Sequence, residues 1–121
     1  MNITPVVNGG KTIAVVSGSE TLVSDVQDAL DLMATVRYEV DCDRIVIHKA
    51  LLSERFFDLK TRLAGEILQK FINYQLKVAV VGDFSGYTSR SLRDFIYECN
   101  NGKDIFFLAD EQQAVEKLSE V

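Results

Sequence analysis

Hydrophobic positions along the chain follow two different spacings, and the first predicts strands. Five short runs are rich in Val, Ile or Phe and are bounded by turn-forming or polar residues, as strands are. They are Ile3–Val7, Lys11–Val16, Arg44–His48, Lys77–Val81 and Ile105–Leu108. Pro5 in the first run is typical of an edge strand, and Asn8-Gly9-Gly10 after it predicts a tight hairpin turn.

The second spacing, of three and four residues, predicts four helices. The segments that carry it begin near Leu22, Ser53, Leu92 and Asp110. The longest helical region runs from Ser53 to about Tyr74, and its apolar stripe is formed by Leu59, Leu63, Ile67 and Phe71. The last helix starts at Asp110 and has Gln113 three positions later, a pattern that predicts an N-terminal cap.

The order of these elements is β-β-α-β-α-β-α-β-α, which predicts an α/β fold in a single domain, residues 1–121. Each strand-helix-strand unit aligns two strands in parallel, so we expect a five-stranded mixed, mostly parallel sheet with four helices. The hairpin adds Ile3–Val7 as an antiparallel edge strand. Phe106 and Phe107 are expected on opposite faces of the sheet. Phe56-Phe57 is expected in the core, or on a partner surface if it is exposed.

Composition and charge narrow the classes of function. Of the 121 residues, 47% are hydrophobic and 26% are charged, which is typical of a globular chain. The net charge of −5 argues against nucleic-acid binding, which needs clustered Lys and Arg. We find no signal-peptide pattern and no apolar run of membrane-spanning length, so we expect a cytoplasmic protein that does not enter a membrane.

Cysteine and histidine are too few to suggest metal or redox chemistry. Cys42 and Cys99 lie far apart and outside any C-x-x-C motif, so we expect two reduced, inert thiols. His48 is the single histidine, and we expect no metal site. The glycine-rich phosphate-binding motifs are absent as well, so we expect no cofactor.

Polar residues gather where the predicted strands end, and ligands of parallel sheets usually bind at that edge. The candidate partner- or ligand-binding residues are His48, Lys49, Ser53, Gly82, Asp83, Phe84 and Ser85. His48 beside Asp83 would be an oriented base, although a hydrogen bond from His48 to a loop is the simpler interpretation. Asp83 is equally suited to binding loop amides. No nucleophile motif accompanies them, so we assign no catalytic residue.

Hydroxyl and arginine side chains mark the start of the third predicted helix. They are Ser85, Thr88, Ser89, Ser91, Arg90 and Arg93. Free amides at a helix N-terminus, together with arginines, form anion sites, whereas serines at the same positions also act as ordinary caps. Free amides at the second and third helix starts would favour an anion or a carboxylate-bearing partner at the strand ends.

Two longer stretches, residues 56–71 (FFDLKTRLAGEILQKF) and 81–95 (VGDFSGYTSRSLRDF), carry a resemblance to a known family. Together they resemble the bacterial domain-of-unknown-function family 4180, and the resemblance extends from about Lys11 to Leu118. That family has no established activity, so the resemblance implies no catalytic residue. Arg62 stands where the family often has a glycine.

At the level of fold, the element order is similar to that of STAS domains of the anti-sigma-factor-antagonist type. The similarity implies a small cytoplasmic switch that binds partner proteins, sometimes under the control of phosphorylation. In those domains the regulated serine lies where the third strand passes into the second helix. The corresponding candidate phospho-acceptors here are Ser53 and Thr61, although the acceptor motif of those domains is absent.

These observations lead us to expect a small binding or regulatory module that interacts with a protein partner, rather than an enzyme. The alternative is a small-molecule-binding protein or enzyme that uses His48, Asp83 and Ser85 at the strand ends. A homodimer, joined through a sheet edge or a helix face, is compatible with either. Filled strand ends favour the module, and a cavity with convergent polar groups favours the enzyme.

Overall fold

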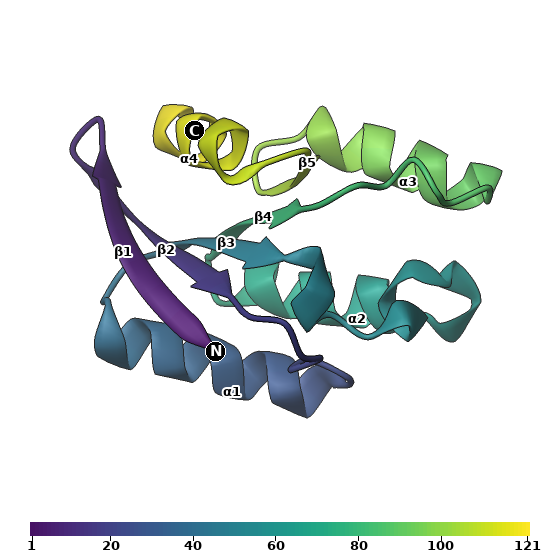
Figure 1. The fold of residues 1–121 in the computed structure, drawn as a ribbon, viewed down its shortest axis with the longest axis horizontal. Coiled ribbons are helices and arrows are strands. Elements are labelled where there is room, and N and C mark those ends of the chain that lie inside the picture. The colour runs from purple at the N-terminus through teal and green to yellow at the C-terminus, as the bar shows by residue number, and fades with distance from the viewer.

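The computed structural model describes residues 1–121, and its centre is a single five-stranded sheet (Figure 1). The strands are β1 (Asn2–Asn8), β2 (Lys11–Ser17), β3 (Arg44–His48), β4 (Lys77–Val81) and β5 (Ile105–Leu108), and they lie side by side in chain order. The β1 strand is antiparallel to β2, and β2 to β5 are parallel. The predicted mixed, mostly parallel sheet is therefore confirmed.

Four helices cover the two faces of the sheet unequally. They are α1 (Val26–Glu39), α2 (Leu63–Asn73), α3 (Arg90–Asn100) and α4 (Glu111–Glu120). Side chains of α1, α2 and α3 join one core cluster of 23 buried residues, which we call the first face. Only α4 packs on the opposite side, the second face, where the core cluster has 8 residues. Figure 1 shows α1 and α4 on opposite sides of the sheet.

Both edges of the sheet are protected by local chemistry. In the hairpin, Gly9 and Gly10 have φ angles of 61° and 79°, which a two-residue turn of this hand requires and glycine adopts without strain. Pro5 lies in the outer strand β1. At the other edge, the Asn100 side chain accepts from the Phe107 amide at 2.7 Å and donates to the Phe107 carbonyl at 3.1 Å. Asn100 thus takes the place of a neighbouring strand.

The helical region predicted from Ser53 to about Tyr74 is not one continuous helix, because the chain forms two 3-10 turns before α2 begins. The turns are Glu54–Phe57 and Leu59–Thr61. Arg62 follows them with a φ of 64°, in the left-handed region that favours glycine, and this conformation prevents a continuous helix. Thr61 Oγ1 donates to the carbonyls of Arg55 and Asp58 and so fixes the turn.

Other local predictions agree with the structure. The Asp110 side chain accepts from the Gln113 amide at 2.8 Å and caps α4 as the sequence pattern indicated. Phe106 packs on the second face and Phe107 on the first, as strand alternation requires. The Phe56-Phe57 pair is buried, with 2% and 4% of each residue exposed. The first helix begins at Val26, one turn later than the pattern indicated, because Asp25 caps it.

None of the four helices combines the length and the apolar character that crossing a lipid bilayer requires.

Candidate functional site

The carboxyl ends of β3 and β4 form the edge at which the sequence placed the candidate residues. His48 ends β3 and pairs in register with Val81, the last residue of β4. The next residues, Lys49 and Gly82, continue outward from the two strands. His48 and Lys49 diverge there: His48 Nε2 lies 2.5 Å from Glu111 Oε1 on α4, whereas Lys49 Nζ lies 4.6 Å from the centre of the Tyr87 ring. The sheet therefore divides the candidate residues into two groups.

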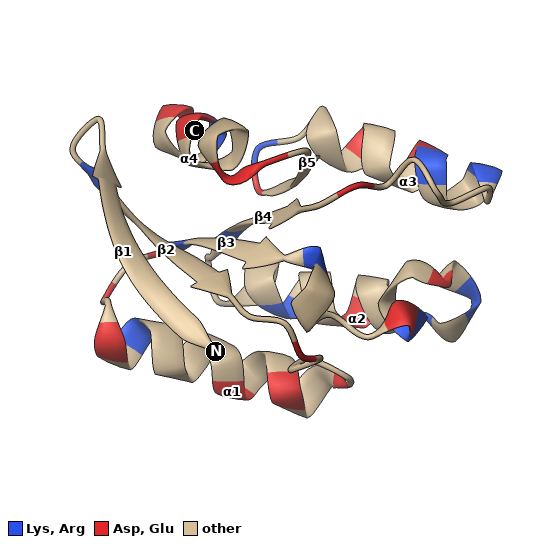
Figure 2. Cartoon of the chain, viewed as in Figure 1, with Lys and Arg blue, Asp and Glu red and all other residues tan.

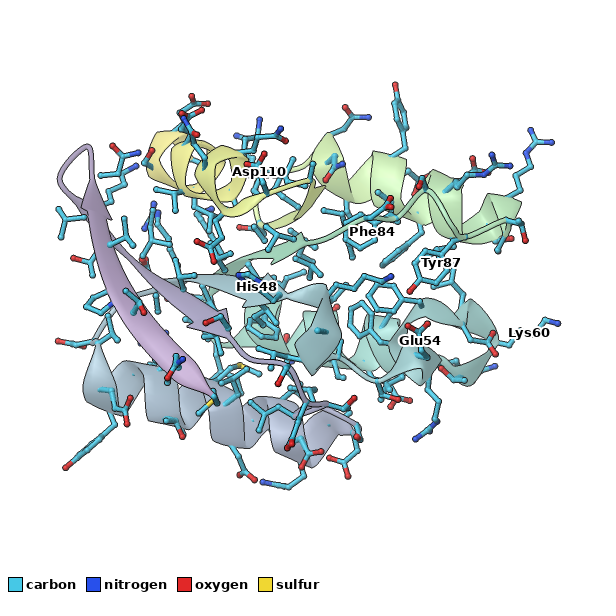
Figure 3. The ribbon with its side chains drawn as sticks, viewed as in Figure 1. His48, Glu54, Lys60, Phe84, Tyr87 and Asp110 are labelled. Atoms are coloured by element: carbon cyan, nitrogen blue, oxygen red, sulfur yellow. The ribbon has the colours of Figure 1, made fainter.

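The group on the first face is built from aromatic rings. Tyr87 stacks on Phe57 with ring centres 5.1 Å apart, and Phe84 lies 6.0 Å from Phe57 and 5.6 Å from Phe107 in the core. Figure 3 shows Phe84, Tyr87 and Glu54 close together and His48 apart from them. We name this group the aromatic rim, and it comprises Lys49, Glu54, Phe57, Asp83, Phe84, Ser85 and Tyr87.

Lys49 lies at the centre of the aromatic rim. Its ammonium group faces the Tyr87 ring at 4.6 Å and the Phe57 ring at 5.8 Å, a cation–π arrangement. The same group donates to the Asp83 carbonyl at 3.3 Å. A Cβ atom at position 82 would lie 2.7 Å from Lys49 Cβ, so glycine at this position lets the lysine stem pack across the end of β4. Gly82 is thus part of the site for a steric reason.

Tyr87 connects the aromatic rings to an acidic side chain. Its hydroxyl donates to Glu54 Oε2 at 3.1 Å. Burial raises the pKa of the Tyr87 hydroxyl above its usual range, with Glu54 adding to the shift and Lys49 opposing it. The phenol is therefore neutral near pH 7, and it acts as a hydrogen-bond donor in the rim.

Asp83 and Ser85 bind each other. The Asp83 carboxylate accepts from the Ser85 amide at 2.9 Å and from the Ser85 hydroxyl at 2.6 Å. These bonds from Ser85 lower the pKa of Asp83, so the carboxylate is ionised near neutral pH. Both residues are exposed, and the arrangement is that of a local turn in which aspartate binds the backbone two residues later.

The structure shows neither of the two arrangements considered for His48, a pairing with Asp83 or a hydrogen bond to a loop. The partner of His48 is Glu111 in the first turn of α4, and the His48 side chain points to the second face. Strand alternation is the physical reason, since His48 lies on the same side of β3 as Val46 and Lys49 does not. The structure therefore separates His48 from Asp83 and Ser85.

The two candidate phospho-acceptors hold turns. Ser53 Oγ accepts from the Arg55 amide at 3.2 Å and caps the first 3-10 turn. The Thr61 hydroxyl shares its single proton between the carbonyls of Arg55 and Asp58, and its oxygen accepts from the Leu63 amide at 3.2 Å. Ser53 and Thr61 are both partly buried, and phosphorylation of either stays a prediction.

The helix starts near the rim are occupied by the chain's own side chains. Ser89 Oγ accepts from the Leu92 amide at 3.2 Å at the start of α3, and Thr61 binds the Leu63 amide at the start of α2. The outer surface of the rim carries the exposed carboxylates Glu54 and Asp83, while Lys49 is held inside. Figure 2 shows an acidic position in the connection from β4 to α3. The rim therefore presents negative charge to solvent.

Side chains occupy the carboxyl ends of β3 and β4, whereas a hollow of about 380 Å³ lies beyond the end of β2, beside Gly18, Ser19 and Leu51. Five hollows of the surface, of about 160 to 530 Å³, are lined by residues outside the aromatic rim and without His48. No group of three or more His, Cys, Asp and Glu side chains is arranged to hold a metal ion. The geometry is that of a filled edge with half-exposed aromatic rings.

Sequence reasoning missed three residues that the structure brings to these strand ends: Glu54, Tyr87 and Glu111. Each has its partner at least 33 positions away in the sequence, so no local spacing marks it. The one available signal was Gly82, because a glycine directly after a buried strand indicates close approach of a neighbouring chain.

Comparison with known proteins identifies the family. The chain belongs to the family described as Domain of unknown function (DUF4180), whose model matches residues 8–118. No curated protein and no solved structure matches the chain. The similarity to STAS domains therefore rests on the order of the elements alone, and it enters only as an analogy.

Proposed function

We propose that this chain is a binding module that contacts a protein partner through the aromatic rim. The observation that carries the proposal is the filled edge: Lys49, Phe84 and Tyr87 occupy the space beyond β3 and β4 where a small ligand would otherwise bind. A small-molecule site needs a concave pocket that surrounds most of its ligand. A protein partner needs only a surface.

The composition of the rim supports a protein partner. Phe84 and Tyr87 are half-buried, and exposed polar residues surround them: Glu54, Asp83 and Ser85. Aromatic side chains with a polar border are enriched at the centres of protein interfaces. Both rings are already held in place, Tyr87 by stacking on Phe57 and Phe84 by an edge-on contact with Phe107, so little conformational entropy would be lost in ordering them on binding.

The charge of the aromatic rim indicates which kind of protein partner it would bind. The side chains of Glu54 and Asp83 face solvent, and the cation of the rim, Lys49, is engaged by the rings and by a carbonyl. A partner that presents Lys or Arg beside an apolar contact therefore complements the rim. By analogy with STAS domains, we propose that the module belongs to a cytoplasmic switch. Ser53 is the more accessible phospho-acceptor, because the Thr61 hydroxyl is engaged both as a donor and as an acceptor.

The alternative function, a small-molecule site or enzyme at His48, Asp83 and Ser85, receives no geometric support. His48 binds Glu111 on the second face, and Asp83 binds Ser85 within one turn. A general base has to lie within hydrogen-bond reach of the group from which it takes a proton. We therefore retain the protein-binding function alone.

The experiment compares two charge-matched variants as bait in extracts of cells that express the native protein. The rim variant combines Glu54→Lys with Asp83→Asn. The control combines Glu116→Lys with Asp94→Asn, which makes the same chemical changes at exposed positions of α4 and α3. Captured proteins are quantified by mass spectrometry, and thermal melting verifies that both variants are folded.

We expect at least one protein to be captured by both the parent and the control. The rim variant should capture about tenfold less of that protein, which corresponds to a loss of about 1.4 kcal/mol of binding free energy. Identical capture by the folded rim variant and the parent would exclude the rim as the binding surface. So would the absence of any protein enriched over empty resin.

A further inference from the structure

A row of side chains on α1, most of them exposed, faces solvent. Its central members are Leu30, Asp31, Ala34, Arg37 and Tyr38, and their spacing of three and four residues places them on one side of the helix. Leu30 is partly buried and the other four are exposed, with Tyr38 91% exposed. Because so much of its surface is in water, the Tyr38 ring is only slightly covered by its own chain.

A hollow of about 300 Å³ lies beside this row, between α1 and the end of α2. Five of its six lining residues are apolar: Leu30, Met33, Ala34, Tyr74 and Leu76. The sixth is Arg37, whose guanidinium donates to the Tyr74 carbonyl at 2.8 Å. The hollow is therefore an apolar depression with a cation at its border.

The row is self-complementary about Ala34. Leu30 and Tyr38 lie four residues to either side of Ala34, and Asp31 and Arg37 lie three residues to either side. When two such helices pair antiparallel with a two-fold axis at Ala34, Leu30 of one copy faces Tyr38 of the other. In the same arrangement Asp31 of one copy faces Arg37 of the other, and every contact occurs twice.

We propose that a second copy of this chain docks on α1, forming a two-fold dimer in which Tyr38 of each copy enters the hollow of the other. Ala34 at the axis is small and exposed, which allows the helices to approach closely. Two apolar contacts and two ion pairs are formed across the axis. Arg37 retains further N–H donors for Asp31 beyond the one that binds Tyr74.

The expected dimer is weak and reversible. The α1 helix has 14 residues and is about 21 Å long, so the interface belongs to the small class of protein contacts. None of the residues of the aromatic rim belongs to the row on α1. Dimerisation is therefore a separate property, and the two proposals can fail independently.

The first test is sedimentation equilibrium of the purified chain over a range of concentrations. We expect the mass to rise from 13.6 kDa towards twice that value as the concentration increases. Tyr38→Ser should weaken association about tenfold or more. The matched control is Tyr97→Ser on α3, where the tyrosine is 69% exposed but outside the row, and it should leave association unchanged.

The second test exchanges the charges of the row. Asp31→Arg and Arg37→Asp should each weaken association, because each places like charges opposite each other. The double variant Asp31→Arg/Arg37→Asp should regain dimerisation, which a general loss of folding could not produce. A parent chain that remains monomeric at the highest concentrations overturns the proposal, and so does dimerisation that is unaffected by Tyr38→Ser or not regained in the double variant.

Discussion

The two faces of the sheet are closed by different means. The first face is covered by α1, α2 and α3 over a core of 23 buried residues. The second face has a core of 8 residues and a single ten-residue helix, α4. Apolar burial is the main stabilising contribution on the first face, and it is limited on the second.

Polar contacts at both ends of α4 compensate for this limited core. Arg44 on β3 donates to the Leu118 carbonyl at 2.7 Å, and Lys11 on β2 donates to the Val121 carbonyl at 3.1 Å. Cations at a helix C-terminus satisfy its free carbonyls and oppose its dipole. At the other end of α4, Glu111 binds His48. The second face is thus held by side chains of the strands at the helix ends.

Because different elements cover the two faces of the sheet, the residues at the strand ends form two sites and not one. His48 contributes to the attachment of α4, while the adjacent Lys49 contributes to the aromatic rim on the first face. Neighbouring residues of a strand serve different layers of the fold, and a list of strand-end residues does not define a single site.

The largest effect is expected on the first face. Phe71 is 2% exposed, and Phe71→Ala should lower the free energy of unfolding by about 3–5 kcal/mol through lost burial and a residual cavity. The control is Ile72→Ala, the next residue along α2, which is 42% exposed and should cost about 1 kcal/mol or less. Urea denaturation measures both, and equal effects would show that the first-face core is misassigned.

The next effect concerns the attachment of α4. Arg44→Met should cost about 2–3 kcal/mol and speed hydrogen exchange in α4, because charged hydrogen bonds to two carbonyls are lost. Lys77→Met is the matched control, since Lys77 pairs in register with Arg44 but binds Asp104 and Lys103, not α4. If Lys77→Met loosens α4 as much as Arg44→Met does, the second face is held by other means.

A smaller effect is expected where β4 meets the aromatic rim. Gly82→Ala should cost about 1–2 kcal/mol, because the new methyl group would overlap the Lys49 stem. A Cβ at Gly86 would meet no atom within 4 Å, so Gly86→Ala should change stability by about 0.5 kcal/mol or less. Thermal melting of the two variants provides the comparison, and a neutral Gly82→Ala would contradict the close packing of Lys49.

The smallest effect is a dependence of stability on pH. Burial raises the pKa of the Cys99 thiol from 9.0 to about 11, with Glu98 adding to the shift. Between about pH 9 and pH 11 the folded chain therefore keeps a proton that the unfolded chain has lost, so the free energy of unfolding falls as the pH rises through this window. Urea denaturation at pH 8 and pH 10.5 should show a steeper fall for the parent than for Cys99→Ala, and equal falls would contradict the raised pKa.

Much of the fold could be predicted because its determinants are local. Hydrophobic spacing located all five strands, and Gly9-Gly10 and Asp110 marked a turn and a cap by their own chemistry. The break before α2 could not be read from spacing, because Leu59 and Leu63 keep the four-residue interval across the turn at Arg62. An apolar stripe indicates which residues face the core. It does not indicate whether the backbone between them is a continuous helix.

The candidate site was harder to predict because its contacts join distant segments. Asp83 and Ser85 are two residues apart, and their mutual hydrogen bonds are typical of a turn that sequence can indicate. The contact of Tyr87 with Glu54, by contrast, spans 33 positions and depends on how two loops pack. The same is true of His48 and Glu111, 63 positions apart, which meet only because α4 lies on the second face.

The central claim is that the aromatic rim is the surface that binds a protein partner. The most direct test is to measure hydrogen exchange of the chain alone and in the presence of the protein captured by the parent bait. We predict that the partner slows exchange at the amides of residues 83–89 and 53–58, which form the aromatic rim and its borders, and leaves exchange in α1 and α4 unchanged. Slower exchange confined to α1 or α4, with the amides of Ser85 and Tyr87 unaffected, would contradict the assignment of the aromatic rim as the binding surface.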